Sequence, residues 1–328
     1  MDYIKVKDIS VKNGWNGVAV FRNVNDAYNT LLAGLISKGN KSKPRGLEVK
    51  DGRHICIKIV EPWDNIVYSR NRKLPPRYLA GEYEWYKSGS NKVDGISKYS
   101  KFWLSIANPD GTVNSNYGYY VFSEEYWQKH IKMAEILNPT LEETRKIKFK
   151  DYKCWWDFAK AQLQDDNDNR QVVIRIPTEL TESTKDTCCT PFIQFFIRNG
   201  KLDLDVNMRS NDIVKGFAND VFQFTMWQGR MAKELGIPMG NYYHSATTEH
   251  IYEPDYLDND TDFEFATSEK DYFKIPEDYL TSKEFEEDLN YLINKEYDKV
   301  KDERLKILIK YQDEKKKMKA SVEAKDNK

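Results

Sequence analysis

The chain has 328 residues, which is enough for one large core or two small ones. Its 51 basic and 52 acidic residues give a formal net charge of −1, so no general attraction to DNA or RNA is expected. Four cysteines do not make a disulfide framework, and no apolar stretch approaches membrane-spanning length. We therefore expect a reduced, cytoplasmic protein with no membrane partner.

The first half of the chain predicts helices and short strands. The helices are expected over residues 25–37, 78–86 and 123–137, and the strands over residues 55–60 and 172–176. Between the first helix and the first strand, residues 39–53 are polar and hold Lys41, Lys43 and Arg45 around Pro44. This composition predicts a loop.

The second half predicts a β-hairpin followed by a long helix. Residues 191–197 and 202–208 flank Asn199-Gly200, a pair typical of a tight hairpin turn. In the second strand apolar residues alternate with polar ones, so one face of it is expected to be buried. The residues of that face are Leu202, Leu204, Val206 and Met208. The long helix is expected over residues 220–235.

The composition changes after about residue 256. Acidic residues cluster first, a helical pattern dense in lysine and glutamate follows, and the last residues are almost wholly polar. We therefore divide the chain into a first domain over residues 1–256, an acidic linker with a charged helical extension over residues 257–312, and a disordered polar tail over residues 313–328.

Six short motifs follow one another in the first domain. They read EYEWYKS (82–88), NSNYG (114–118), CTPFIQF (189–195), NMRSND (207–212), GFAND (216–220) and HIY (250–252). Cys189 offers the strongest common side-chain nucleophile, and the adjacent Arg209 and Ser210 suit a phosphate. In this order the motifs resemble the thymidylate synthase superfamily, and its deoxycytidylate hydroxymethylase branch more than thymidylate synthase itself. The resemblance covers residues 26–256.

The resemblance implies an α/β (α+β) enzyme with a large mixed β-sheet, flanking helices and a dimer formed through the sheet. It also implies transfer of a one-carbon unit from 5,10-methylenetetrahydrofolate to C5 of dCMP, with water completing the reaction to 5-hydroxymethyl-dCMP. Similar bacteriophage enzymes make modified DNA precursors, which would place the chain in the cytoplasm of a bacterial host. The alternatives are a methyl product, CMP or dUMP as the substrate, and a nucleotide-binding protein without catalysis.

Within this resemblance, Cys189 is the nucleophile that adds to C6 of the pyrimidine and so activates C5. Cys188 is expected to face away from the site, because neighbouring residues beside a strand point to opposite sides. Glu82 is the general acid–base. Leu79 and Trp85 lie beside it on the predicted helix, and burial there is expected to raise its pKa towards neutrality.

Two further residues are expected to decide the substrate and the product. Asp220 stands where thymidylate synthase has asparagine, and a carboxylate accepts from N4–H of cytosine, whereas an amide suits uracil. The alternative for Asp220 is an acid that stabilises the start of a helix. Thr248 stands where the hydroxymethylase has serine, and its hydroxyl is the candidate for positioning the water.

The remaining candidate residues bind the nucleotide or the folate. The substrate-binding set is Arg45, Arg170, Gln194, Arg209, Ser210, Asp220, His250 and Tyr252. The folate-binding set is Trp103, Tyr117, Asp212 and Gly216, and no metal site is expected. Arg170 is expected to reach the phosphate site of the neighbouring subunit, where the family usually has two arginines and this chain has Arg170-Gln171. Arg209 is also expected to lower the pKa of the Cys189 thiol. Taken singly, each arginine would more often form a surface ion pair and His250 would more often be a core histidine.

Overall fold

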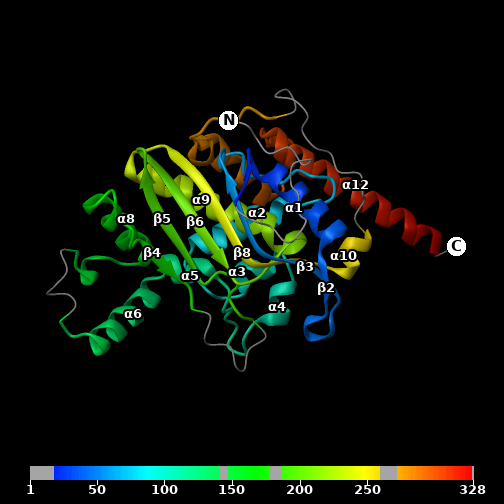
Figure 1. The fold of residues 1–328 in the computed structure, drawn as a ribbon. Coiled ribbons are helices and arrows are strands. Elements are labelled where there is room, and N and C mark those ends of the chain that lie inside the picture. Colours follow the sequence, from blue (N-terminus) through cyan, green and yellow to red (C-terminus); the bar gives the residue numbers. More distant parts are fainter. Residues whose placement is uncertain (1–17, 141–146, 178–185, 259–271, 327–328) are drawn as a thin grey trace.

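The computed structural model describes residues 18–140, 147–177, 186–258 and 272–326, with side chains up to residue 317. One eight-stranded mixed β-sheet forms its centre (Figure 1). The strands are β1 (Ala19–Phe21), β2 (Asn40–Ser42), β3 (Val49–Ile59), β4 (Val173–Arg175), β5 (Phe192–Arg198), β6 (Lys201–Met208), β7 (Asn211–Asp212) and β8 (Met239–Tyr252). They lie in the order β1-β3-β8-β6-β5-β4, with β2 paired to β3 and β7 paired to β8.

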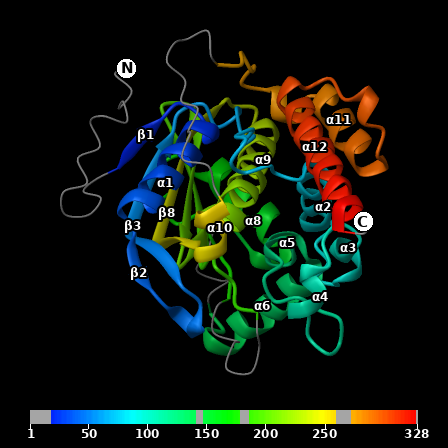
Figure 2. The ribbon, with the colours of Figure 1, turned by 90° about the vertical axis from the view of Figure 1, so that its right-hand side faces the viewer.

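Helices cover one face of the sheet. The α-helices of the described residues are α1 (Val24–Lys38), α2 (Pro76–Lys87), α3 (Asp94–Ser97), α4 (Phe102–Ile106), α5 (Tyr117–Phe122), α6 (Glu124–Leu137), α8 (Trp155–Asp165), α9 (Ala218–Leu235), α10 (Glu253–Asp258), α11 (Lys283–Asn294) and α12 (Glu303–Asp326). Helix α9 packs on β6 and β8, and Figure 2 shows α2, α5, α8 and α9 gathered on the same side.

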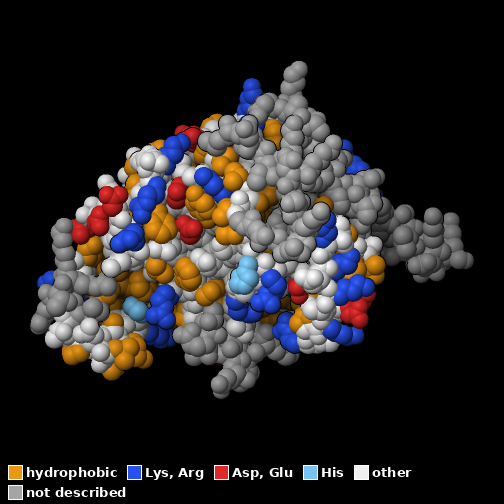
Figure 3. All heavy atoms as spheres, viewed as in Figure 1, with side chains coloured by type: hydrophobic (Ala, Val, Ile, Leu, Met, Phe, Trp, Pro, Cys, Tyr) orange, Lys and Arg blue, Asp and Glu red, His pale blue; other side chains and the backbone are white. Residues whose placement is uncertain are grey.

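The opposite face of β5, β6 and β8 carries no helix of the described residues, and apolar and charged side chains lie side by side on it (Figure 3). The predicted mixed sheet with flanking helices is therefore confirmed. Formation of a dimer through the open face stays a prediction.

The predicted hairpin is confirmed as β5 and β6, which pair from Phe192 with Asn207 to Arg198 with Lys201. Its turn residues have positive φ angles, 53° at Asn199 and 71° at Gly200, as a tight turn between twisted strands requires. The four apolar residues of the predicted inner face of β6 are all buried. The second strand of the hairpin ends at Met208, and the Arg209-Ser210 pair follows directly.

The loop predicted over residues 39–53 is wrong in part, because the structure forms a β-hairpin there. Strand β2 pairs with the first residues of β3, and β3 begins at Val49. The reason is long-range pairing. Strand β8 binds β3 along its whole length, from Val49 opposite Tyr252 to Ile59 opposite Tyr242. Arg45 remains in the exposed turn between the two strands, with a positive φ of 52°.

At the C-terminal end, α11 and α12 form the helical extension. Residues 259–271 of the predicted acidic linker lie outside the described residues. From residue 313 the sequence predicts a disordered tail, whereas in the structure α12 continues to Asp326. This segment has no glycine or proline and is rich in lysine, glutamate and alanine, all of which favour a helix. The domain limits themselves stay a prediction.

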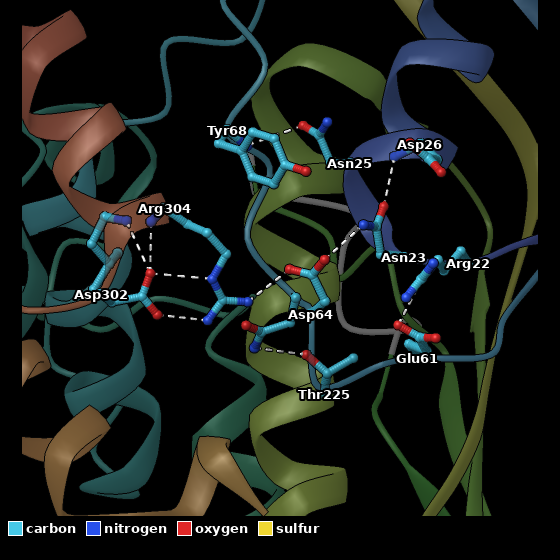
Figure 4. A network of polar contacts seen from close by, with 12 residues as sticks. Arg22, Asn23, Asn25, Asp26, Glu61, Asp64, Tyr68, Thr225, Asp302 and Arg304 are labelled. Atoms are coloured by element: carbon cyan, nitrogen blue, oxygen red, sulfur yellow. Dashed lines mark hydrogen bonds and ion pairs between the residues drawn. The ribbon is translucent and has the colours of Figure 1, made fainter. Parts of the chain in front are cut away.

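Arg304 joins this extension to the part of the fold that carries α1 (Figure 4). Its fully buried guanidinium forms ion pairs with Asp64 at 2.8 Å and with Asp302 at 2.6 Å. Asp64 in turn accepts a hydrogen bond of 2.6 Å from Asn23, the residue that caps the start of α1. The start of α12 is therefore fixed to the same core that carries α1.

Candidate active site

The two adjacent cysteines lie in different surroundings just before β5. Cys188 is buried, its thiol donates to the Asn114 carbonyl at 3.1 Å, and burial raises its pKa to about 12. Cys189 is only half-buried, and its thiol lies 3.9 Å from the Thr187 carbonyl. As the alternation of side chains predicts, Cys189 alone keeps an accessible side.

Arg209 and Arg45 both act electrostatically on the Cys189 thiol. Nε of Arg209 donates to the Cys188 carbonyl at 2.9 Å, and its backbone N–H donates to the Cys189 carbonyl at 2.8 Å. Burial is the largest influence on the pKa of Cys189 and raises it, while the two arginines lower it and Asp220 raises it. Arg209 therefore has the expected sign, but the pKa of the thiol stays above its ordinary value.

Glu82 is buried at the centre of a short hydrogen-bond network. Its Oε1 accepts from the Tyr78 hydroxyl at 2.6 Å and its Oε2 accepts from Nε2 of Gln223 at 3.2 Å. Burial raises the pKa of Glu82 to about 7, and these two donors keep it from rising further. The expected shift towards neutrality is therefore present, and a carboxyl that titrates there can both take and return a proton near pH 7.

Asp220 lies in the first turn of α9 and is half-buried. Its Oδ2 accepts from Nδ2 of Asn211 at 2.8 Å. Burial, followed by the nearby Glu82, raises the pKa of Asp220 to about 8. Gly216 lies in the π-helical turn before α9, directly against this hydrogen bond. Asp220 is thus held by a donor on one oxygen and electrostatically linked to the general acid–base candidate.

Ser210, His250 and Tyr252 lie close to one another. Oγ of Ser210 is 3.5 Å from Nδ1 of His250, and the ring of His250 meets that of Tyr252 at 5.2 Å and 81°. Burial lowers the pKa of His250, while Asp212 opposes that shift. The Asp212 carboxylate accepts from two backbone N–H groups of the following turn, at 2.9 and 3.0 Å. The motifs at residues 207–212 and 250–252 therefore meet where β7 pairs with β8.

Trp103 and Tyr117 lie on the helical side of the same region. Nε1 of Trp103 donates to the Tyr78 hydroxyl at 3.0 Å, which links it to Glu82 through one residue. Tyr117 is stacked on Phe224, with ring centroids 5.8 Å apart, and after burial the largest influence on its pKa comes from Cys189. The two aromatic residues predicted for the cofactor therefore lie close to the catalytic candidates.

Three predicted residues are not joined to this cluster by any contact recorded among the described residues. Arg170 is exposed, and its carbonyl accepts from the Gln194 side chain at 2.8 Å. Gln194 is half-buried on β5 between the buried Ile193 and Phe195, so its side chain lies on the open face of the sheet. Thr248 is half-buried on β8, two residues before His250. Their predicted roles stay predictions.

Several residues of the site were missed in the sequence. The contact of Tyr78 with Glu82 could have been predicted from the sequence, because Tyr78 lies four residues before Glu82 on a predicted helix and so shares its face. No sequence pattern indicates Gln223, since its hydrogen bond to Glu82 joins residues of two helices that are 141 positions apart in the chain. No pattern indicates Arg72 either: it lies in a loop, and its Nε is buried with no partner among the described residues.

Comparison with known proteins agrees with this geometry. The family model for thymidylate synthase matches residues 26–320. The deoxyuridylate hydroxymethyltransferase of Bacillus phage SP01 is 29% identical over 70% of this chain and 57% of its own length. The deoxycytidylate 5-hydroxymethyltransferase of Enterobacteria phage T4 is 31% identical over 45% of this chain and 52% of its own length. The chain thus spans little more than half the length of these two relatives.

Among solved structures, the thermostable thymidylate synthase A of Bacillus subtilis matches with a TM-score of 0.54 and 19% identity, over 70% of this chain and 80% of that one. This likeness concerns the fold. The family model, which covers most of the chain, identifies it as a member of the thymidylate synthase family. The resemblance stated from the motifs is therefore confirmed.

The site also fits the folate that this family uses. A folate has a flat ring system and an anionic tail. Trp103 is flanked by Phe102 and Leu104, which are 62% and 53% exposed and leave apolar surface for a flat group. The unpartnered, buried Nε of Arg72 offers a donor to an anion, and burial lowers the pKa of its guanidinium. Trp103 and Arg72 would therefore hold the cofactor, with Asp212 nearby.

Among the residues that the structure describes, no group of three or more His, Cys, Asp or Glu side chains is arranged to hold a metal ion. No helix in the same part of the chain is long and apolar enough to cross a membrane.

Proposed function

We propose that the chain is a deoxycytidylate 5-hydroxymethyltransferase that uses 5,10-methylenetetrahydrofolate. One observation supports this most: a half-buried thiol (Cys189), a carboxyl with a pKa near neutrality (Glu82) and an acid in place of an amide (Asp220) meet in one site. The phage relatives named above carry out hydroxymethylation according to their names.

The thiolate of Cys189 adds to C6 of the pyrimidine, which breaks the conjugation of the ring and makes C5 nucleophilic. The methylenetetrahydrofolate supplies the one-carbon unit that C5 receives. The Glu82 carboxylate takes the proton from C5 as the one-carbon unit separates from tetrahydrofolate, which would leave as the second product. Water then adds to the methylene group left on C5, and departure of the thiolate from C6 restores the ring. Since the pKa of Glu82 is about 7, the residue can take this proton and pass it on at neutral pH.

In this proposal Asp220 recognises the base, and Thr248 determines whether the product carries a hydroxymethyl or a methyl group. The carboxylate of Asp220 accepts from N4–H of cytosine. The Thr248 hydroxyl, close to His250 on β8, positions the water that completes the hydroxymethyl group. If water were excluded at this point, hydride from the folate would reduce the methylene group and give a methyl product instead.

The nucleotide is held by its phosphate and sugar. Arg45, Arg209 and Ser210 bind the 5′-phosphate through charge-assisted hydrogen bonds, and His250 with Tyr252 binds the sugar hydroxyl. In a dimer formed through the open face of the sheet, Arg170 of the partner subunit completes the phosphate site. The exposed position of Arg170 beside that face supports this arrangement.

Deoxyuridylate is a second candidate substrate. A relative covering 70% of the chain is named a deoxyuridylate hydroxymethyltransferase. In addition, the pKa of Asp220 is raised to about 8, so much of it is a neutral acid at pH 7 and can donate to O4 of uracil.

The proposal is tested by incubating the protein with methylenetetrahydrofolate and either dCMP or dUMP and identifying the product by mass. The expected product is 5-hydroxymethyl-dCMP. Cys189→Ala is the control, and it should form no product. Conversion of dUMP alone, or no conversion of either nucleotide by the unaltered protein, would contradict the proposal.

A further inference from the structure

Asn211, Gly216 and Asp220 form a closely packed unit. Nδ2 of Asn211 donates to Oδ2 of Asp220 at 2.8 Å, and the Asn211 side chain is only 2% exposed. A methyl group at Gly216 would lie 2.9 Å from that Nδ2 and 3.1 Å from that Oδ2. A side chain at Gly216 would therefore press on both atoms of this hydrogen bond.

The hydrogen bond makes the two oxygens of Asp220 unequal. An amide NH₂ group can only donate, so Oδ2 has to act as the acceptor. When Asp220 is protonated, its proton is therefore favoured on Oδ1. This oxygen is the one left to meet a base.

We infer that Asn211 is a positioning residue that fixes Asp220 through Oδ2, so that Oδ1 meets the group at C4 of the pyrimidine and its charge state selects between cytosine and uracil. The inference rests on the function proposed above. An ionised Oδ1 accepts from the N4 amino group of cytosine and repels the O4 carbonyl of uracil. A protonated Oδ1 donates to O4 of uracil.

Among the described residues, the titratable groups that interact electrostatically with Asp220 are carboxyls, phenols and one thiol. They come from α2, α5, β7, β8 and the segment before β5: Glu82, Tyr78, Tyr86, Tyr117, Asp212, Tyr242, Glu249 and Cys189. Glu249 is fully buried, pairs with Asn211 across β7 and β8, and has a pKa raised well above its ordinary value by burial.

Burial, Glu82 and Asp212 raise the pKa of Asp220, and the hydrogen bond from Asn211 lowers it. Together they bring this pKa to about 8. Below that pH Asp220 is mostly neutral and tolerates uracil, and above it Asp220 is ionised and favours cytosine. The preference for dCMP over dUMP should therefore rise with pH through about 8.

The test is to measure the dissociation constants of dCMP and dUMP by calorimetry between pH 6.5 and pH 9.0, without folate. The ratio of the two constants cancels the titration of the phosphate that both nucleotides carry. In Asn211→Leu, which cannot donate, loss of a hydrogen bond to a charged group should move the midpoint up by about one to two pH units, to the upper end of this pH range or beyond it. At pH 8.5 the preference for dCMP should then fall about tenfold.

Two more variants separate positioning from general damage. Gly216→Ala keeps Asn211 but crowds the hydrogen bond, so it should move the midpoint in the same direction. Asn219→Leu is the matched control: Asn219 is also buried and adjoins Asp220, but its amide donates to the Lys215 carbonyl at 2.9 Å. Its midpoint should stay at the value of the unaltered protein. Circular dichroism checks that each variant is folded.

A wild-type ratio that does not change with pH would overturn the inference without any variant. An unchanged midpoint in folded Asn211→Leu and Gly216→Ala would also overturn it, while turnover of dCMP by the unaltered protein would keep the proposed function. If the unaltered protein neither binds nor converts either nucleotide, the proposed function fails and the inference fails with it.

Discussion

Replacement of Tyr78 by phenylalanine tests the role of Glu82 most sharply. The Tyr78 hydroxyl donates to Oε1 of Glu82 at 2.6 Å, and this bond is the strongest of the contacts that lower the pKa of Glu82. Without it, only Gln223 and the more distant Arg72 oppose the effect of burial. The pKa of Glu82 should therefore rise above its present value of about 7.

The size of the shift follows from the hydrogen bond. A hydrogen bond to a charged group contributes about 1.5–3 kcal/mol, which corresponds to roughly one to two pH units. Removal of the C5 proton needs the carboxylate, so kcat/KM should rise with pH through the pKa of Glu82. In Tyr78→Phe this rise should move to about pH 8–9, with a loss of about tenfold at pH 7 that recovers at higher pH.

The assay is kcat/KM for dCMP at saturating folate from pH 6 to pH 9.5. Tyr83→Phe is the matched control, because Tyr83 adjoins Glu82 on α2 but its ring lies under Lys87 at 5.9 Å. Its profile should be that of the unaltered protein. An equal loss of activity in Tyr78→Phe at every pH would refute the argument, since it would show damage to the site without a change in the pKa of Glu82.

Three further predictions follow from the same structure. Cys189→Ala should abolish turnover while calorimetry still detects dCMP binding; remaining turnover would exclude Cys189 as the nucleophile. Arg304→Met should lower the free energy of unfolding by about 3–5 kcal/mol in urea, because Asp64 and Asp302 would keep buried, unpaired charges; a loss below about 1 kcal/mol would show that the ion pairs add little. Thr248→Val should raise the share of methyl product in mass spectra, and an unchanged product ratio would remove Thr248 from the water step.

Much of the fold follows from local patterns in the sequence. The Asn199-Gly200 turn and the alternation along β6 predict the hairpin and its buried face, because both are set by neighbouring residues. The raised pKa of Glu82 could be predicted for a similar reason, since Leu79 and Trp85, three residues before and after it on α2, are buried with it.

What the sequence did not predict depends on contacts between distant segments. Strand β3 begins at Val49 because β8 pairs with it, about 200 residues later in the chain. The ion pair between Arg304 and Asp64 joins residues 240 positions apart. No local pattern contains such information.

The candidate site was predicted mostly through the family motifs. The motifs indicated Cys189, Glu82 and Asp220. In the structure Asp220 lies close enough to the other two to interact electrostatically with each. The motifs did not name Asn211, although it stands within a motif, because its bond to Asp220 depends on the π-helical turn between them.

The central claim is that this site activates C5 of a cytosine nucleotide. The most direct measurement is release of tritium from [5-³H]dCMP and [5-³H]dUMP in the presence of methylenetetrahydrofolate, with the products identified by mass. The account predicts release from dCMP with formation of 5-hydroxymethyl-dCMP, and loss of that release in Cys189→Ala. Release from dUMP alone, or from neither nucleotide, would contradict it.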